Sequence, residues 1–213
     1  MRREFYDLMA DFCMQCGAEL GVPPAFCHAC GTIQPFRPEL SLFAVVGLPA
    51  SFALDPQTLR QRVLDLQKML HPDRFAHADA TRRRYSLEWS TRLNEALALL
   101  RDPLKRADYL LQAQGVDALG EQVKVADPAL LMSQMVYRER LEDLLAARDQ
   151  QGLEHLRAEV TAAVDKAIEK LGVLLKTLPC TQSEAAGAVL RELQFLDKLQ
   201  GEIDHSEESL QNL

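Results

Sequence analysis

The chain has 213 residues, with 24 basic and 31 acidic side chains and a formal charge of -7. An acidic chain lacks the basic footprint of general nucleic-acid binding, and no apolar run approaches the roughly 18 residues that span a bilayer, so we expect neither nucleic acid nor membrane as a partner. The apolar content of 47% excludes a disordered chain.

The charge is unevenly distributed along the chain. Residues 41–111 carry 11 basic and 8 acidic side chains, whereas residues 112–213 carry 10 and 18. Two parts of opposite charge suggest two different partners. The first seven residues, MRREFYD, include acidic side chains and no apolar stretch follows them. We therefore expect no signal or transit peptide, and a reducing compartment.

The first feature in chain order is a pair of C-x-x-C-G sequences, at residues 13–17 and 27–31. Two residues between the thiols of each pair let both sulfur atoms reach one ion, and the glycine that follows can bring main-chain N–H groups toward sulfur. Four thiolates suit a tetrahedral, structural zinc site without an open position for water. A redox dithiol, a disulfide pair, an iron site and a nucleic-acid zinc ribbon are the alternatives. The expected zinc ligands are Cys13, Cys16, Cys27 and Cys30.

A proline-rich linker follows the cysteines, since Pro35 and Pro38 favour extended backbone. The segment before it has no helical period, so metal binding would supply much of its folding energy, on the order of 10 kcal/mol in comparable peptides. We therefore expect metal removal to unfold residues 10–34 and to leave the helical part of the chain melting as before.

Helix signals dominate the rest of the sequence. An Asp-Pro pair stands at residues 55–56, 102–103 and 127–128, and each Asp is suited to cap a helix that begins at the Pro. Apolar residues at spacings of three and four indicate amphipathic helices, and strands are not expected beyond short hairpins in the cysteine loops. The expected helices are 41–46, 56–70, 80–100, 103–114, 128–149, 153–177 and 183–204.

The expected fold is all-α. The apolar stripes of helices 56–70 and 80–100, joined by a short loop, predict an antiparallel hairpin. The last three helices have stripes of their own and should form a separate three-helix bundle. The chain thus combines an N-terminal zinc-knuckle module, a helical hairpin and a C-terminal bundle.

The loop of the predicted hairpin contains His71-Pro72-Asp73. Pro72 ends the first helix, and Pro followed by Asp favours a turn that presents His71 and Asp73 at its tip. By itself this tripeptide is an ordinary helix connector. Basic side chains flank it, for which a plain solvated face is the alternative; they include Arg62, Lys68 and Arg74.

The helix, His-Pro-Asp loop and antiparallel helix resemble a J domain, by which DnaJ-type co-chaperones engage a DnaK-type ATPase. More of the chain is similar to the HscB/Jac family of J proteins, which serve iron–sulfur cluster assembly. The cysteine extension resembles that of the tetracysteine members of this family. The residues that carry the resemblance are Gly47-Leu48-Pro49, His71–Phe75, Asn94-Glu95-Ala96, Asp102–Leu111, Leu130-Leu131-Met132, Arg138-Glu139 and Phe195–Leu199.

The resemblance implies three domains, which are a tetracysteine module with its linker (1–38), a J domain (39–115) and a scaffold-binding domain (116–213). It implies that His71, Pro72 and Asp73 contact a DnaK/HscA-type chaperone and stimulate its ATP hydrolysis. The flanking Arg62, Lys68 and Arg74 would steer this partner by charge, an effect that salt screens.

The resemblance further implies that the C-terminal domain binds an IscU-type scaffold protein, on which iron–sulfur clusters are built. A Leu/Met stripe that packs in the core is the alternative. Ser133 and Val136 stand where bacterial relatives commonly have acidic residues, which reduces the charged part of the expected contact. The implied scaffold-binding residues are Leu131, Met132, Met135, Val136, Glu139, Asp143 and Phe195.

The expected function is therefore that of a co-chaperone, not an enzyme, which delivers the scaffold to the chaperone, stimulates its ATPase and promotes cluster transfer. A general J protein with a zinc module and other clients is the alternative. A thiol oxidoreductase using Cys13 and Cys16 would need an exposed thiol of low pKa, which metal-bound thiolates do not supply. The expected location is the bacterial cytoplasm, with the mitochondrial matrix as the alternative.

Overall fold

The computed structural model describes residues 12–120 and 128–211. It divides into two compact units, residues 1–106 and 107–213, each of which is considered by itself. Within the described residues all regular structure is helical, apart from two isolated β-bridges in the cysteine loops, Phe12–Glu19 and Phe26–Ile33. The predicted all-α fold class is confirmed.

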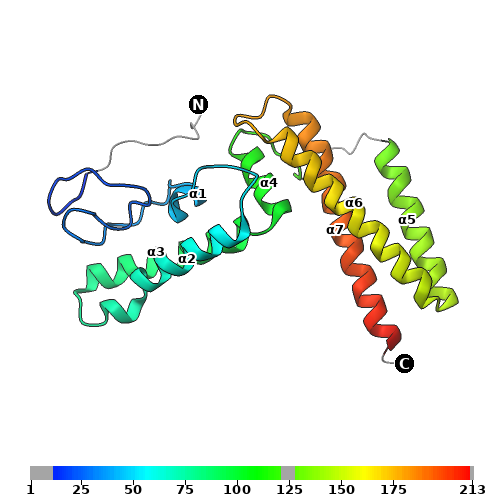
Figure 1. Cartoon of the computed structure of the whole chain (residues 1–213), viewed down its shortest axis with the longest axis horizontal. Helices are drawn as coiled ribbons and strands as arrows, with labels where there is room; N and C mark the ends of the chain where they lie inside the picture. Colours follow the sequence, from blue (N-terminus) through cyan, green and yellow to red (C-terminus); the bar gives the residue numbers. More distant parts are fainter. Residues whose placement is uncertain (1–11, 121–127, 212–213) are drawn as a thin grey trace. The chain divides into compact units, whose positions relative to one another are not determined.

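The first unit is built on a helical hairpin. Helices α2 (Pro56–Leu70) and α3 (Ala80–Leu100) run antiparallel, the short 3-10 helix η1 (Pro72–Phe75) connects them, and α1 (Leu42–Val46) packs on both (Figure 1). The bounds of both long helices agree with the prediction because each begins at an aspartate cap. The carboxylate of Asp55 accepts a hydrogen bond from the Thr58 N–H at 2.7 Å, and Asp79 caps α3 in the same way.

The core of this unit follows the apolar stripes of the sequence. The α2 side of the core consists of Leu59, Val63, Leu66 and Leu70. The α3 side includes Trp89, Leu93, Ala96 and Leu100. All of these side chains are almost completely buried.

The second unit is a bundle of α5 (Pro128–Ala147), α6 (Gln150–Leu174) and α7 (Ser183–Gln211). α6 and α7 pack against each other over most of their length, and α5 packs on both (Figure 1). Helix α6 begins three residues before the predicted 153, because the side chain of Asp149 accepts a hydrogen bond from the Gly152 N–H at 2.9 Å and caps the helix there. One cluster of the core of the bundle is formed by Leu141, Leu153, Leu156, Val160, Phe195, Leu196, Leu199 and Ile203.

Helix α7 continues past the predicted end at residue 204. An ion pair of 3.4 Å between Arg157 on α6 and Glu207 on α7 holds the added turn against the neighbouring helix.

Helix α4 (Pro103–Gln112) starts in the first unit and ends in the second. The cysteine segment and the hairpin thus share one unit. The predicted division into domains 1–38, 39–115 and 116–213 stays a prediction. Residues 1–11 and 121–127 of the first and third predicted domains lie outside the described residues.

None of the helices in the described ranges is long and apolar enough to cross a lipid bilayer. The longest, α6 and α7, are interrupted by charged side chains throughout.

Gly47, which ends α1, lies against Pro23 of the cysteine loops, so a substitution at Gly47 tests whether these loops pack closely on the helical part of the first unit. Its φ is +70°, and a Cβ atom there would lie 2.6 Å from Cδ of Pro23 in the cysteine loops. We expect Gly47→Ala to lower the free energy of unfolding by about 1–3 kcal/mol, measured by chemical denaturation.

The matched control is Gly201→Ala on α7, where a Cβ atom would meet nothing within 4 Å. Alanine is the better helix former, so this change should be neutral or stabilise by up to about 1 kcal/mol. Equal stability of the Gly47 variant and the unaltered chain would contradict the close approach of Pro23.

Candidate functional site

Four cysteine thiols meet in the loops before α1. The sulfur atoms of Cys13, Cys16, Cys27 and Cys30 all lie within 4.8 Å of one another. The distance is 3.6 Å both between Cys13 and Cys30 and between Cys16 and Cys27. Four sulfur atoms bound at about 2.3 Å to one tetrahedral ion are about 3.8 Å apart, so the observed spacing fits a single metal ion. None of the cysteines in the described residues forms a disulfide.

The two cysteine pairs have the same local backbone. Gly17 and Gly31 each have a φ of +71°, which a glycine adopts without strain. The N–H of Gly17 donates to the Cys13 carbonyl, and that of Gly31 to the Cys27 carbonyl, both at 2.8 Å. Hydrogen bonds from the side chain and backbone of Thr32 lower the pKa of Cys30 to about 6. At least this sulfur is therefore readily available as the thiolate that a metal requires.

The cysteine loops pack on the core of the first unit through Gln34. The side-chain N–H of this buried glutamine donates to Sγ of Cys13 at 3.4 Å. Its backbone carbonyl accepts a hydrogen bond of 2.9 Å from the indole N–H of Trp89 on α3. Phe36 packs edge-on against the Trp89 ring, with 5.1 Å between the centroids. Trp89 belongs to the apolar stripe of the predicted helix 80–100, whereas the sequence indicates no role for Gln34, because its partners are distant in the chain.

His71, Pro72 and Asp73 lie at the tip of the hairpin, in the predicted turn. Helix α2 ends at Leu70, because Pro72 has no N–H to continue it, and η1 begins at Pro72. The side chains of His71 and Asp73 are 59% and 89% exposed. Nδ1 of His71 accepts a hydrogen bond of 3.3 Å from the Asp73 N–H, so the turn is ordered while both side chains face solvent.

Two serines of α3 hold the end of α2 in place. The carbonyl oxygen of Leu70 accepts hydrogen bonds from the hydroxyl groups of Ser86, at 2.6 Å, and Ser90, at 3.1 Å. Ser86 is completely buried, so a helix-end carbonyl is satisfied away from water. These residues position the turn that carries His71. The sequence alone does not reveal their role, because a serine within a helix gives no sign of its distant partner.

The three basic residues predicted to steer the chaperone are exposed but not equivalent. Nζ of Lys68 lies 3.4 Å from Oδ1 of Asp65. Nη1 of Arg74 donates to the Lys68 carbonyl at 3.3 Å and so caps the last turn of α2. Arg62 lies six residues before Lys68, about 120° around the helix. The structure therefore brings Lys68 and Arg74 together beside the turn and leaves Arg62 apart.

The solvent-facing side of α5 carries six of the seven implied scaffold-binding residues. Met132 and Met135 are 70% and 71% exposed, and the core contact of α5 is made from its other side, where Leu141 is buried. The alternative that this stripe packs in the core is therefore wrong. These six exposed residues, called the α5 face below, are Leu131, Met132, Met135, Val136, Glu139 and Asp143.

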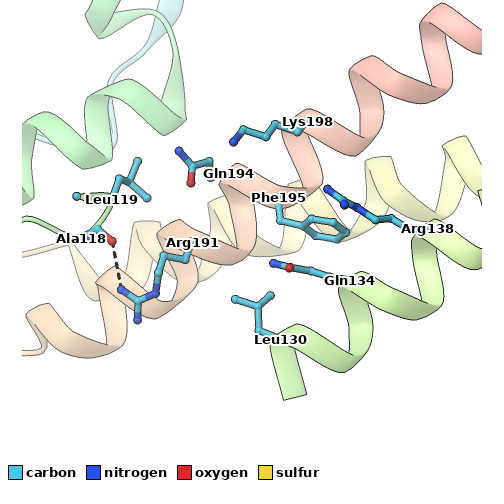
Figure 2. Close-up of a pocket in the computed structure, with 10 residues that line it drawn as sticks. Ala118, Leu119, Leu130, Gln134, Arg138, Arg191, Gln194, Phe195 and Lys198 are labelled. Carbon is cyan, nitrogen blue, oxygen red and sulfur yellow. Dashed lines mark hydrogen bonds between the residues drawn. The ribbon is translucent and has the colours of Figure 1, made fainter. Parts of the chain in front are cut away.

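Phe195, the seventh implied residue, lies in the core of the bundle. It is on α7 and only 9% exposed, and its ring centroid is 6.3 Å from that of Tyr137 on α5. It reaches the surface at a pocket of about 230 Å³ between α5 and α7. In Figure 2, Gln134 and Arg138 extend from α5 beside the Phe195 ring. Phe195 therefore does not extend the exposed α5 face, but it lines the pocket next to it.

Residues 126–204 match the family described as the HSCB C-terminal oligomerisation domain. The co-chaperone protein HscB homolog of Paraburkholderia xenovorans is 41% identical to this chain over 172 residues, which cover 81% of this chain and 97% of that protein. The chain belongs to the HscB co-chaperone family. The HscB homolog of Burkholderia cenocepacia is likewise 41% identical, over 171 residues that cover 80% of this chain and 96% of the relative.

Solved structures of HscB proteins have the same fold. The chaperone HscB from Vibrio cholerae is 34% identical, with a TM-score of 0.69 over 80% of this chain and 99% of that chain. The human co-chaperone protein HscB is 24% identical, with a TM-score of 0.78 over 91% of this chain and 97% of its own. The human structure thus matches the fold of a larger part of this chain. Membership of this family fits a co-chaperone role in iron–sulfur cluster assembly, and the Paraburkholderia, Burkholderia and human relatives are named as co-chaperones, not as enzymes.

The link from Cys13 through Gln34 to Trp89 changes the expected effect of metal removal. We expect a chelator to lower the melting temperature of the first unit by at least about 5 °C, which corresponds to roughly 1 kcal/mol for a unit of this size. Trp89 is the only tryptophan, so its fluorescence reports this transition directly.

Cys16→Ser should lower the melting temperature reported by Trp89 fluorescence in the same way. Cys180→Ser, which changes a thiol outside the cluster, should leave this temperature unaltered. If chelation disordered residues 12–34 without moving the Trp89 transition, the cysteine loops would be the separable module that the sequence predicts.

Proposed function

We propose that this protein is a co-chaperone that brings an IscU-type scaffold protein to a DnaK/HscA-type chaperone, stimulates the chaperone's ATPase and promotes transfer of the iron–sulfur cluster. The observation that carries the proposal is the exposed His71-Pro72-Asp73 turn at the tip of the hairpin, in a chain of the HscB family. An ordered turn loses little conformational freedom on binding, so it suits contact with a second protein.

The charge around this turn supports an acidic partner surface. Lys68 and Arg74 lie beside it, and residues 41–111 carry three more basic than acidic side chains (11 against 8). Such charges speed association over long range and are screened by salt. Hydrolysis would take place at the ATP site of the chaperone, so His71 acts in this chain as a contact residue and not as an acid or base. The protein itself catalyses no reaction.

The α5 face is the proposed surface for the scaffold protein. Burial of each large apolar side chain on this face would contribute about 1.5–3 kcal/mol, of which the entropy of association offsets a part. Unbranched methionines can adjust to the shape of a partner. The carboxylates of Glu139 and Asp143 favour basic residues on the scaffold at the far end of the contact.

The cysteine cluster is proposed to hold one structural zinc ion. Four thiolates close a tetrahedral site that suits zinc, and no ligand position remains for water or substrate. Bound there, the ion would stabilise the loops that pack on Trp89.

The three proposed functional domains are the tetracysteine module with its linker (1–38), the J domain (39–115) and the scaffold-binding domain (116–213). The bacterial relatives support a location in the bacterial cytoplasm.

His71→Gln tests the chaperone contact. We expect it to reduce stimulation of the chaperone's ATPase at least about tenfold, because it removes a contact group from the tip of the turn. Since the side chain is exposed, the melting temperature should stay unaltered.

The matched control is His77→Gln, which changes another exposed histidine close by and should keep full stimulation. ATP hydrolysis should be measured with purified chaperone, with and without the scaffold protein. Full stimulation by the His71 variant would remove the basis of the proposal.

Met132→Ala combined with Met135→Ala tests the scaffold contact. We expect the affinity for an IscU-type scaffold protein to fall about tenfold or more, because both side chains leave water on binding. Titration calorimetry measures this affinity. Phe195→Ala is less suitable, because truncation of this core residue would destabilise the bundle by about 3–5 kcal/mol.

Val173→Ala on α6 is the control for this variant, since it removes exposed apolar surface from the same bundle outside the α5 face. It should bind the scaffold as the unaltered chain does. Equal affinities of the double variant and the unaltered chain would exclude the α5 face as the docking surface.

A further inference from the structure

The pocket between α5 and α7 is lined by basic and amide side chains. Its charged residues are Arg138 on α5 and Arg191 and Lys198 on α7, and Gln134 and Gln194 add two amide groups (Figure 2). Among the described residues that line it there is no acidic side chain. The bundle is acidic as a whole, since residues 112–213 carry 10 basic and 18 acidic side chains. The charge of the pocket is therefore opposite to the net charge of the bundle around it.

Three of the other basic residues of the bundle are paired with glutamates. Arg140 and Arg157 each pair with a glutamate, at 2.6 Å and 3.4 Å, and Lys170 pairs with another at 3.5 Å. Within the part of the chain that the structure describes, none of the three pocket cations has a carboxylate within 4 Å. Arg191 instead donates to the carbonyl of Ala118 at 3.3 Å, which fixes its side chain at the edge of the pocket.

The pocket adjoins the α5 face. Leu130, Gln134 and Arg138 line it and recur at four-residue intervals, so they form one stripe along α5. Leu131 and Met135 of the α5 face follow directly on Leu130 and Gln134 in the sequence, and they form the next stripe around the helix. A protein that covers the α5 face therefore reaches the rim of the pocket.

We propose that this pocket binds an acidic side chain of the scaffold protein that docks on the α5 face, an inference that rests on the proposed function. Guanidinium, ammonium and amide groups all donate hydrogen bonds to a carboxylate. The volume of about 230 Å³ admits a glutamate or aspartate side chain, whose methylene groups would lie against the Phe195 ring. Partial exclusion of water makes such an ion pair stronger than one on an open surface.

This subsite would add specificity to an otherwise adaptable apolar contact. The α5 face offers carboxylates at Glu139 and Asp143, whereas the pocket offers cations beside Phe195. A partner must therefore present basic groups to Glu139 and Asp143 and an acidic group to the pocket. A protein with only an apolar patch would leave the pocket cations without a counter-charge.

The test combines Arg138→Glu and Lys198→Glu in the full-length chain, because both side chains are exposed and neither variant disturbs the Arg191 contact. We expect the affinity for purified IscU-type scaffold protein to fall at least about tenfold, and the dependence of affinity on salt to become weaker. Lys166→Glu with Lys176→Glu, an equal charge change at exposed positions away from the pocket, should leave the affinity within about twofold. An equal loss in this control would mean general electrostatics and would overturn the proposal.

A charge swap identifies the partner group. Acidic residues of the scaffold protein are changed to lysine one at a time, and one of these changes should weaken binding to the unaltered chain and restore binding to the Arg138/Lys198 variant. Failure of every swap to restore binding would overturn the pocket assignment. If Met132/Met135 variants lose the scaffold while the pocket variant binds normally, the pocket proposal alone fails. If the unaltered chain does not bind the scaffold protein, the proposed function fails as well.

Discussion

The buried indole of Trp89 is the contact on which the first unit depends. Its N–H finds an acceptor in the Gln34 carbonyl, and a buried indole without this partner would cost about 1–3 kcal/mol. Because the side chain of Gln34 is bound to Cys13, the position of α3 and the position of the cysteine loops are set together. On either side of Trp89 in α3, Ser86 and Ser90 hold the end of α2. One helix therefore places both the four-cysteine cluster and the turn that carries His71.

The bundle follows a different principle, since its buried core does not include the α5 face. Its core is filled from α6, α7 and one side of α5, while large apolar side chains remain in water on the other side. Exposed apolar surface of this kind is typical of interaction sites, which is why the α5 face is the proposed docking surface. Phe195 is both a core residue of the bundle and a lining residue of the pocket between α5 and α7.

The formal charge of -7 averages surfaces of different local charge. The hairpin is basic near the turn, the α5 face ends in carboxylates, and three cations gather in a pocket of an otherwise acidic bundle. If the four cysteines bind zinc as thiolates, the cysteine segment becomes more acidic, and the basic hairpin lies between two acidic stretches of sequence. Electrostatic recognition by this chain is therefore a property of local surfaces and not of its net charge.

The sequence by itself determined the features that depend on near neighbours in the chain. Aspartate caps set the starts of several helices, and apolar periodicity identified their buried faces. The doubled C-x-x-C-G identified the four-cysteine cluster, and the His-Pro-Asp turn followed from the proline. The family resemblance, carried by short motifs, added the α5 face. Only the tertiary structure decided which of these parts touch. Gln34 and Trp89 are 55 residues apart, and the pocket draws its cations from two helices. Periodicity shows which face of a helix is buried but not what it packs against, so these contacts, like the burial of Phe195, required the folded chain.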